Sequence, residues 1–287
     1  MRAHAAAFLS DVEATPDSPE AGVAHRAAGM TCWFAGEYVE ARDHLERALA
    51  LFQRGRDDDL AFRFGQDSGV ATMGSLAIVS WPLGEIDRAI SLIDRMQTRI
   101  ADLTHVATLA LGKALATLFE LMRRDQQRAA QNAFELARLA REHELIMYSA
   151  FGMFLEGWVT AAGGAPGGGL EAVRHAVDDL RQQNVPLYDG LLKIALAEAE
   201  ARAGYPDRAI TIPDEALATC DRLGFRAFKA ELHWFSVASL PGKTYRNANP
   251  YGPGSRTAFD VAASSRSDGH DASKSWARHV SQRVSRN

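Results

Sequence analysis

One stretch of the sequence reads Ala28-Gly29-x-x-Cys32-x-x-x-Gly36-x-x-x-x-Ala41-x-x-x-Leu45-x-x-Ala48. The small residues recur at helical spacing on both sides of the glycine. Small side chains let two antiparallel helices approach closely, and a large one fills the space between them and the next helix. The stretch therefore predicts a helical hairpin with its turn at Gly36.

The same turn signal recurs at a fixed interval. The turn positions are 36, 84, 124, 164 and 204, so successive spacings are 48, 40, 40 and 40 residues. Such self-similarity resembles the tetratricopeptide repeat, whose usual period is about 34 residues, and each pair should carry about one extra turn or a longer linker. An insertion around Gln53 to Gln66 explains the longer first spacing. HEAT-like repeats, with a period near 40, are the alternative. The turn glycine followed by alanine five residues later favours the tetratricopeptide pattern.

The predicted fold class is all-α, a tetratricopeptide-like helical-hairpin solenoid of about five 40-residue repeats with an irregular C-terminal tail. We expect residues 1–20 to form a helix of a truncated preceding repeat and residues 21–240 to form the array. An array needs polar caps at its ends, and the missing N-terminal cap indicates a piece of something longer. Pro166 with the three glycines after it predicts a loosened turn, and Pro213 predicts a kinked or shortened helix.

The composition changes abruptly after Leu240. Residues 241–287 contain no Leu, Ile, Met or Glu but eight Ser, and eight Lys and Arg against three Asp make this tail +5. The tail is either a disordered basic extension or the product of a reading-frame shift near residues 235–245. The sudden loss of helix-forming residues favours the second interpretation.

Charge and cysteine content restrict the class of partner. A net charge of −4 and a pI near 6.1 give no reason to expect nucleic acid or an anionic membrane as a partner. The two cysteines, Cys32 and Cys220, fit a reducing compartment. Neither a secretory signal nor a membrane-spanning stretch is present in the sequence. We therefore predict a cytoplasmic protein that binds other proteins.

No motif predicts catalysis, a cofactor or a metal. The run Gly242-Lys243-Thr244 matches the end of a phosphate-binding loop, but Val237 stands where that loop needs glycine. The acidic run at 57–59 lacks the alternating acids of a calcium loop. None of the nine histidines has another three or four residues away, so no helical metal site is indicated.

The first helices of tetratricopeptide hairpins line a concave groove, and large side chains fall at groove positions here. An arginine among aromatic rings would suit an extended peptide or an amphipathic helix. The alternative is that the tryptophan rings pack against neighbouring helices, as most large aromatic side chains do. The predicted groove residues are Arg26, Met30, Trp33, Trp81, Phe154 and Trp158.

Two segments carry a more specific resemblance. They read His25-Arg26-Ala27-x-Gly29-Met30-Thr31-Cys32-x-Phe34-Ala35-Gly36-Glu37-Tyr38 and Asp58-x-x-Ala61-Phe62-Arg63-Phe64-Gly65-Gln66-Asp67. Over residues 8–235 the chain resembles the C-terminal tetratricopeptide-repeat region of multidomain bacterial signalling proteins. These proteins join a class III adenylate or guanylate cyclase domain to an AAA-type ATPase.

The resemblance implies a regulatory or protein-interaction role beside an enzyme. It transfers no catalysis, because the chain lacks the metal-binding aspartates of cyclases and a complete phosphate-binding loop. Two alternatives stay open from the sequence. The chain could be a small-ligand-sensing regulatory domain that controls a partner enzyme, or a non-functional truncated remnant.

Overall fold

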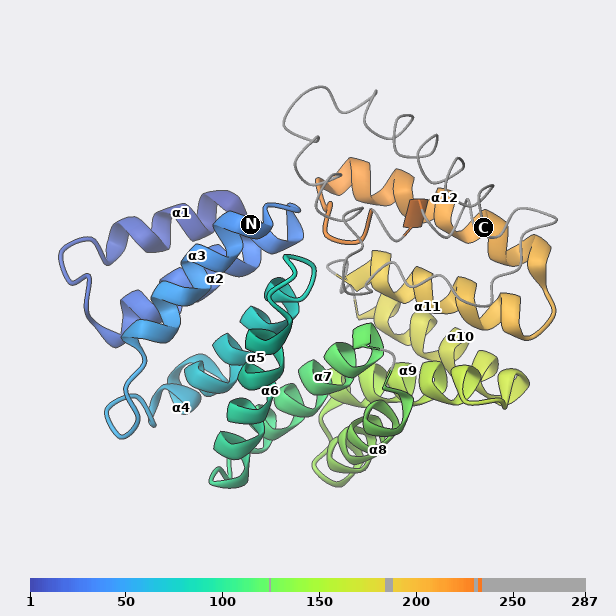
Figure 1. Cartoon of the computed structure of the whole chain (residues 1–287), viewed down its shortest axis with the longest axis horizontal. Helices are drawn as coiled ribbons and strands as arrows, with labels where there is room; N and C mark the ends of the chain where they lie inside the picture. Colours follow the sequence, from blue (N-terminus) through green and yellow to red (C-terminus); the bar gives the residue numbers. More distant parts are fainter. Residues whose placement is uncertain (124, 184–187, 230–231, 234–287) are drawn as a thin grey trace. The chain divides into compact units, whose positions relative to one another are not determined.

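A computed structural model describes residues 1–123, 125–183, 188–229, 232 and 233 (Figure 1). Over this part of the chain the protein is all-α, as predicted. The helices are α1 (Arg2–Asp11), α2 (Pro19–Phe34), α3 (Tyr38–Leu51), α4 (Leu60–Phe64), α5 (Ser68–Ser80), α6 (Ile86–Ala101), α7 (Val106–Arg123), α8 (Gln126–Glu142), α9 (Ile146–Ala162), α10 (Pro166–Gln182), α11 (Asp189–Arg202) and α12 (Pro206–Leu223).

The predicted turns are built from one repeated backbone device. Gly36 has a φ of 78°, and Gly84, Gly164 and Gly204 are also left-handed, at 83°, 108° and 88°. The residue after each glycine donates its N–H to the carbonyl five residues earlier, as Glu37 does to Cys32 over 2.9 Å. This bond satisfies an orphan carbonyl at the end of the first helix, and glycine adopts the required left-handed conformation without steric cost.

The same hydrogen bond, from an N–H to the carbonyl five residues earlier, recurs at a turn that has no glycine. Asp125 donates its N–H to Glu120 over 2.9 Å, and its side chain accepts from the N–H of Arg128. Asp125 therefore caps α8 and marks the third turn of the 40-residue period. Position 124, which the sequence also placed in this turn, lies outside the described residues.

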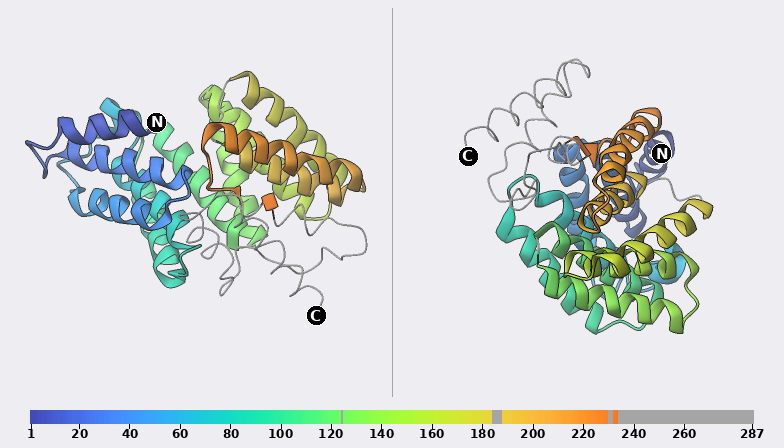
Figure 2. Two further views of the ribbon diagram at one scale, coloured as in Figure 1. Left: turned by 90° about the horizontal axis from the view of Figure 1, so that it is seen from above. Right: turned by 90° about the vertical axis from the view of Figure 1, so that its right-hand side faces the viewer.

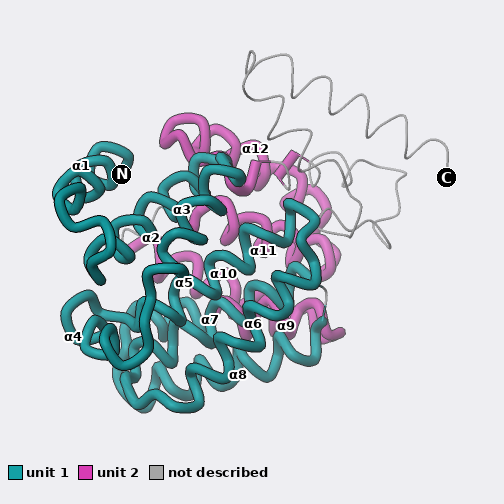
Figure 3. The backbone as a smooth tube through the Cα atoms, turned by 60° about the vertical axis from the view of Figure 1, so that its left-hand side comes forward, with its two compact units in different colours: residues 1–152 teal, residues 153–287 magenta. Residues whose placement is uncertain are grey.

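Consecutive helices pair as hairpins, and the chain divides into two compact units, residues 1–152 and 153–287 (Figure 3). In the first unit α2 packs on α3, α5 on α6 and α7 on α8. In the second unit α11 packs on α12 and α10 on α11. These pairs can be followed by colour in Figure 2. The hairpins confirm the predicted repeat architecture.

The quoted motif works as predicted in the first hairpin. Ala41 and Leu45 of α3 have no exposed surface, and Ala48 is 1% exposed. A Cβ added at Gly29 of α2 would lie only 2.7 Å from Cγ of Leu45. The glycine therefore sets the close approach of α2 to α3.

The segment that joins the α2–α3 hairpin to the α5–α6 hairpin is longer than the segment that joins α5–α6 to α7–α8. It runs from the end of α3 at Leu51 to the start of α5 at Ser68 and contains the short helix α4. Only four residues separate α6 from α7, from 102 to 105. The predicted insertion thus accounts for the spacing of 48.

The expectation of a loosened turn at Pro166 was wrong. Pro166 begins α10, where its missing N–H has no helical partner to lose, and the glycines after it form the first turn of that helix rather than a loose turn. Gly169 is packed so closely that a Cβ there would overlap the backbone nitrogen of Ala161 in α9. Of the two effects expected at Pro213, a shortened helix is not found, since α12 continues to Leu223, and a kink stays a prediction.

The N-terminal helix lies within the predicted range. The structure forms α1 over Arg2–Asp11, inside the predicted residues 1–20. The tail at 241–287 lies outside the described residues. In the described part of the chain no helix combines the length and apolar character needed to cross a bilayer.

Candidate functional site

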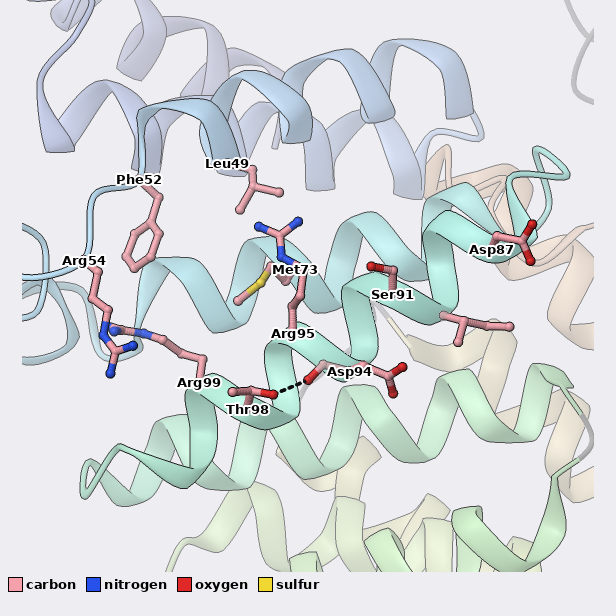
Figure 4. A pocket seen from close by; sticks show the side chains of 11 residues that line it. Leu49, Phe52, Arg54, Met73, Asp87, Ser91, Asp94, Arg95, Thr98 and Arg99 are labelled. Atoms are coloured by element: carbon pink, nitrogen blue, oxygen red, sulfur yellow. Dashed lines mark hydrogen bonds between the residues drawn. The ribbon is translucent and has the colours of Figure 1, made fainter.

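A groove lies between α3 and α6 in the first unit. Both helices pack against α5 and far less against each other, which leaves a pocket of about 520 Å³ above α5 (Figure 4). Its lining residues are Leu49, Phe52, Arg54, Met73, Asp87, Ile90, Ser91, Asp94, Arg95, Thr98 and Arg99.

The floor of this groove is apolar and its rim is polar. Met73 of α5 is buried, and Leu49, Phe52 and Ile90 are half-buried. The six exposed lining residues are all polar or charged: Arg54, Asp87, Ser91, Asp94, Arg95 and Thr98. An apolar floor with a hydrated rim is the usual anatomy of a surface that binds another protein.

Ion pairs link α3 to α6 near the N-terminus of α6. Nη1 of Arg88 lies 2.6 Å from Oε1 of Glu46, and Nη1 of Arg42 lies 3.1 Å from Oε1 of Glu85. Because α3 and α6 are each the second helix of their hairpin, these ion pairs join two neighbouring hairpins. They therefore bound this end of the groove.

A buried network bounds the other end. Nη2 of Arg99 lies 2.6 Å from Oδ2 of Asp67 and 2.6 Å from Oδ1 of Asp58. The Arg99 guanidinium also lies 5.1 Å from the centre of the Phe52 ring. The bond to Asp67, ahead of that to Asp58, raises the pKa of Arg99, and the bond from Arg99 lowers the pKa of Asp58. Arg99 is thus a fixed cation whose charge is already compensated.

Asp67 ends the segment that carried the specific resemblance, residues 62–67, and this segment is attached to several helices. Nη2 of Arg63 lies 2.8 Å from Oε1 of Glu20 in α2. The backbone nitrogen of Asp67 donates to Oγ1 of Thr108 in α7 over 2.8 Å. The segment therefore joins α2, α6 and α7 around the start of α5, and it positions Arg99 at the groove.

Three charged side chains of the groove have no partner in the described part of the chain. Arg54 pairs with Asp102 over 2.6 Å, and Arg99 pairs with two aspartates. The side chains of Asp87, Asp94 and Arg95 make no hydrogen bond or ion pair there. All three are on α6 and exposed, so they are the charges that a bound molecule could meet.

The predicted groove residues lie elsewhere. Arg26 and Met30 are half-buried on α2, and Trp33 on the same helix is 6% exposed. Trp81, just after α5, is also 6% exposed, and its ring meets Phe119 edge-on at 5.4 Å. This burial fits the alternative interpretation, in which the rings pack against neighbouring helices.

The two predicted residues on α9 belong to the second unit. Phe154 has no exposed surface and Trp158 is 8% exposed. Nε1 of Trp158 donates to Oε2 of Glu198 over 2.8 Å, which ties α9 to α11. Four of the six predicted residues therefore lie in the first unit and two in the second, and their role in binding stays a prediction.

Arg26, like Arg95, has no acidic partner among the described residues, but its side chain is half-buried whereas that of Arg95 is exposed. With the Gln66 amide turned to satisfy both groups, its oxygen accepts from Nη1 over 2.8 Å and from Nη2 over 3.0 Å. Nε of Arg26 is buried and has no hydrogen-bond partner among the described residues. Burial lowers the pKa of this guanidinium.

The α3–α6 groove was not predicted from the sequence, because the polar residues of its rim match the solvent face of any amphipathic helix. Only the packing of α3 and α6 against α5 determines which of their solvent-facing residues border a groove. Among the described residues, no three His, Cys, Asp or Glu side chains gather as metal ligands would.

No family model matches the chain. No curated protein matches it in sequence. Among solved structures, aspartyl phosphate phosphatase F from Bacillus subtilis is similar, with 11% identity and a TM-score of 0.49. The match covers 82% of this chain and 60% of that one, so the chain spans less than two thirds of that protein's length. A likeness of this size carries no argument about activity.

Proposed function

We propose that the chain is a non-catalytic protein-interaction module that holds a segment of a partner protein in the α3–α6 groove. The observation that carries this proposal is the open form of the groove: six of its eleven lining residues are exposed, over a half-buried apolar floor. An apolar floor supplies affinity by removing the partner's side chains from water.

The open rim favours a peptide over a small metabolite. Small-molecule sites bury about 70–90% of their ligand, which needs walls on most sides. Here only Met73 and Arg99 of the lining are buried. A partner segment needs no such enclosure, because its own backbone and neighbouring side chains cover the floor.

The resemblance carried by residues 25–38 and 58–67 supports a finer proposal. The partner is a signalling enzyme of the class III cyclase and ATPase type, or a regulator of one. In this proposal the segment 62–67 serves the groove by positioning Arg99 through Asp67.

Selection from a random library of 16-residue peptides tests the proposal. Peptides are selected on the whole chain, and their affinity is measured by fluorescence anisotropy. We expect Ile90→Glu to weaken the selected peptides at least tenfold, because a carboxylate on the half-buried floor must lose water when the peptide binds. Val39→Glu is the matched control, since Val39 is an exposed aliphatic residue of α3 outside the groove.

Equal affinity for the two variants, with circular dichroism unchanged, would place binding elsewhere and contradict the proposal. Failure to select any peptide would contradict it as well. A metabolite that stabilises the chain thermally, and loses this effect in Ile90→Glu, would favour the ligand-sensing alternative.

A further inference from the structure

The charges of the groove are sorted along α6. Asp87 lies in the first turn of the helix, while Arg95 and Arg99 lie in its last two turns. Figure 4 shows Asp87 at the opposite end of the pocket from Phe52 and Arg54. Arg99 and Arg54 are neutralised by aspartates. The lining charges without an ion-pair partner are therefore Asp87 at one end and, nearer the other, Arg95 with its neighbour Asp94.

Arg95 is placed to meet a ligand rather than its sequence neighbour. Figure 4 shows its side chain extending toward Met73 on the floor, whereas the carboxylate of Asp94 points in a different direction. Asp94 makes no ion pair with it. A carboxylate above Met73 could accept from Arg95 in the bidentate geometry that a guanidinium favours.

We propose that the groove selects an amphipathic helix that carries an acidic and a basic side chain two turns apart on its apolar side. The acid pairs with Arg95, the base pairs with Asp87, and apolar side chains between them cover Leu49, Met73 and Ile90. This inference rests on the proposed function, and it adds the chemistry and spacing of the partner.

The spacing follows from helix geometry. Asp87 and Arg95 are eight residues apart on α6, so at about 1.5 Å of rise per residue they are about 12 Å apart along its axis. A bound helix lying along α6 spans that distance in seven or eight residues. Residues seven or eight apart also share one face of a helix, so both charges can point into the groove while the apolar residues between them face the floor.

The site favours a helical partner segment because its walls are themselves helices. The groove is the space between two helices that pack on a third, α5. A further helix laid there can pack its side chains into the ridges and grooves of α3 and α6.

A double-mutant cycle on the library-selected peptides tests the inference. We expect these peptides to carry an acid and a base seven or eight positions apart. Replacing that acid by Gln should weaken binding to the natural chain about threefold at low salt, as for a partly exposed ion pair, and should not weaken binding to Arg95→Gln. Replacing the basic residue of the peptide by Gln should likewise weaken binding to the natural chain and should not weaken binding to Asp87→Asn.

Two matched controls separate a specific pair from general charge effects. Arg141→Gln removes an exposed arginine of α8, and Asp214→Asn removes an exposed aspartate of α12, both outside the groove. Neither should abolish the effect of the peptide substitutions. The coupling at Arg95 and Asp87 should shrink at high salt.

The outcomes distinguish this inference from the proposed function. Peptides that bind in the groove, with sensitivity to Ile90→Glu but no coupling to Arg95 or Asp87, would overturn the charge pattern and leave the function standing. An absence of groove-dependent peptides would overturn both. Coupling at both positions supports both.

Discussion

Arg99 and Asp67 form a buried ion pair beside the groove. Nη2 of Arg99 lies 2.6 Å from Oδ2 of Asp67, and the two side chains are 7% and 1% exposed. Oδ1 of Asp67 also accepts from the backbone nitrogen of Val70, so the same carboxylate caps α5. The pair fixes α6 against the start of α5 and thereby one end of the groove.

Removing Asp67 should destabilise the chain strongly. Asp67→Ala leaves Arg99 buried with one partner and removes the cap of α5, so we expect a loss of about 3–5 kcal/mol in urea unfolding. Asp58→Ala removes the other partner of Arg99, but the Asp58 side chain is 50% exposed, and we expect a loss of at most about 1 kcal/mol. Similar losses for the two variants would contradict this account of the network.

Arg26 and Arg99 should respond in opposite ways to the same substitution. Arg26 has only a neutral amide oxygen as acceptor and a buried Nε without a partner. Arg26→Met should therefore leave the free energy of unfolding unchanged or raise it, because it removes a half-buried charge that no acidic partner compensates. Arg99→Met should lower it by about 3–5 kcal/mol, because Asp67 is left buried and unpaired. A loss of stability in Arg26→Met as large as in Arg99→Met would disprove the distinction.

Alanine substitutions at two adjacent glycines of α10 should change the stability of the chain in opposite directions. A Cβ at Gly168 meets open space, so Gly168→Ala should stabilise the chain by about 0.5–1 kcal/mol through helix propensity. A Cβ at Gly169 would overlap the backbone of α9 at Ala161, so Gly169→Ala should cost about 1–3 kcal/mol. Thermal unfolding of the two variants measures both effects, and a stabilising Gly169→Ala would show that α9 and α10 pack less closely.

A histidine pair in the first hairpin predicts acid sensitivity. Nδ1 of His25 in α2 lies 3.0 Å from Nδ1 of His44 in α3, which requires one of the two nitrogens to be unprotonated. Burial first, and then the charges of His44 and Arg47, lower the pKa of His25. The unfolded chain therefore binds more protons than the folded chain once the pH falls below about 6.5.

The free energy of unfolding should accordingly be highest above pH 6.5. It should decline as the pH falls from there through the lowered pKa of His25. One such group contributes at most about 1.4 kcal/mol per pH unit. Urea unfolding between pH 8 and pH 5 measures the slope. His25→Gln should flatten it, while His143→Gln, which changes an exposed histidine at the end of α8, should not. An unchanged slope in His25→Gln would assign the acid sensitivity to other groups.

The sequence predicted the hairpins well because its signals are local. Gly36 and Gly84 mark left-handed turns, and Ala41 and Leu45 fix the face that α3 buries. Both kinds of signal are set within one or two helical turns. At Pro213 the shortened helix is not found, because α12 continues to Leu223 around a buried proline that is unfavourable in an isolated helix.

The binding surface was harder to predict, because burial and neighbours depend on packing between hairpins. Trp33 and Trp81 have the spacing of groove residues, yet both rings are almost wholly buried. Arg95 looks like any exposed arginine of an amphipathic helix until α3 is placed opposite it. Arg26 was singled out from its position alone, and only the structure shows that it lacks an acidic partner.

The most direct test of the account is to map where a selected peptide binds. Methyl and backbone NMR spectra of the whole chain would be recorded with and without the peptide. We predict that the changes centre on Leu49, Met73 and Ile90, which form the floor between α3 and α6. Changes centred on Met30 and Trp33 of α2, with the α3–α6 floor unaffected, would contradict the account and return binding to the surface of the first helices.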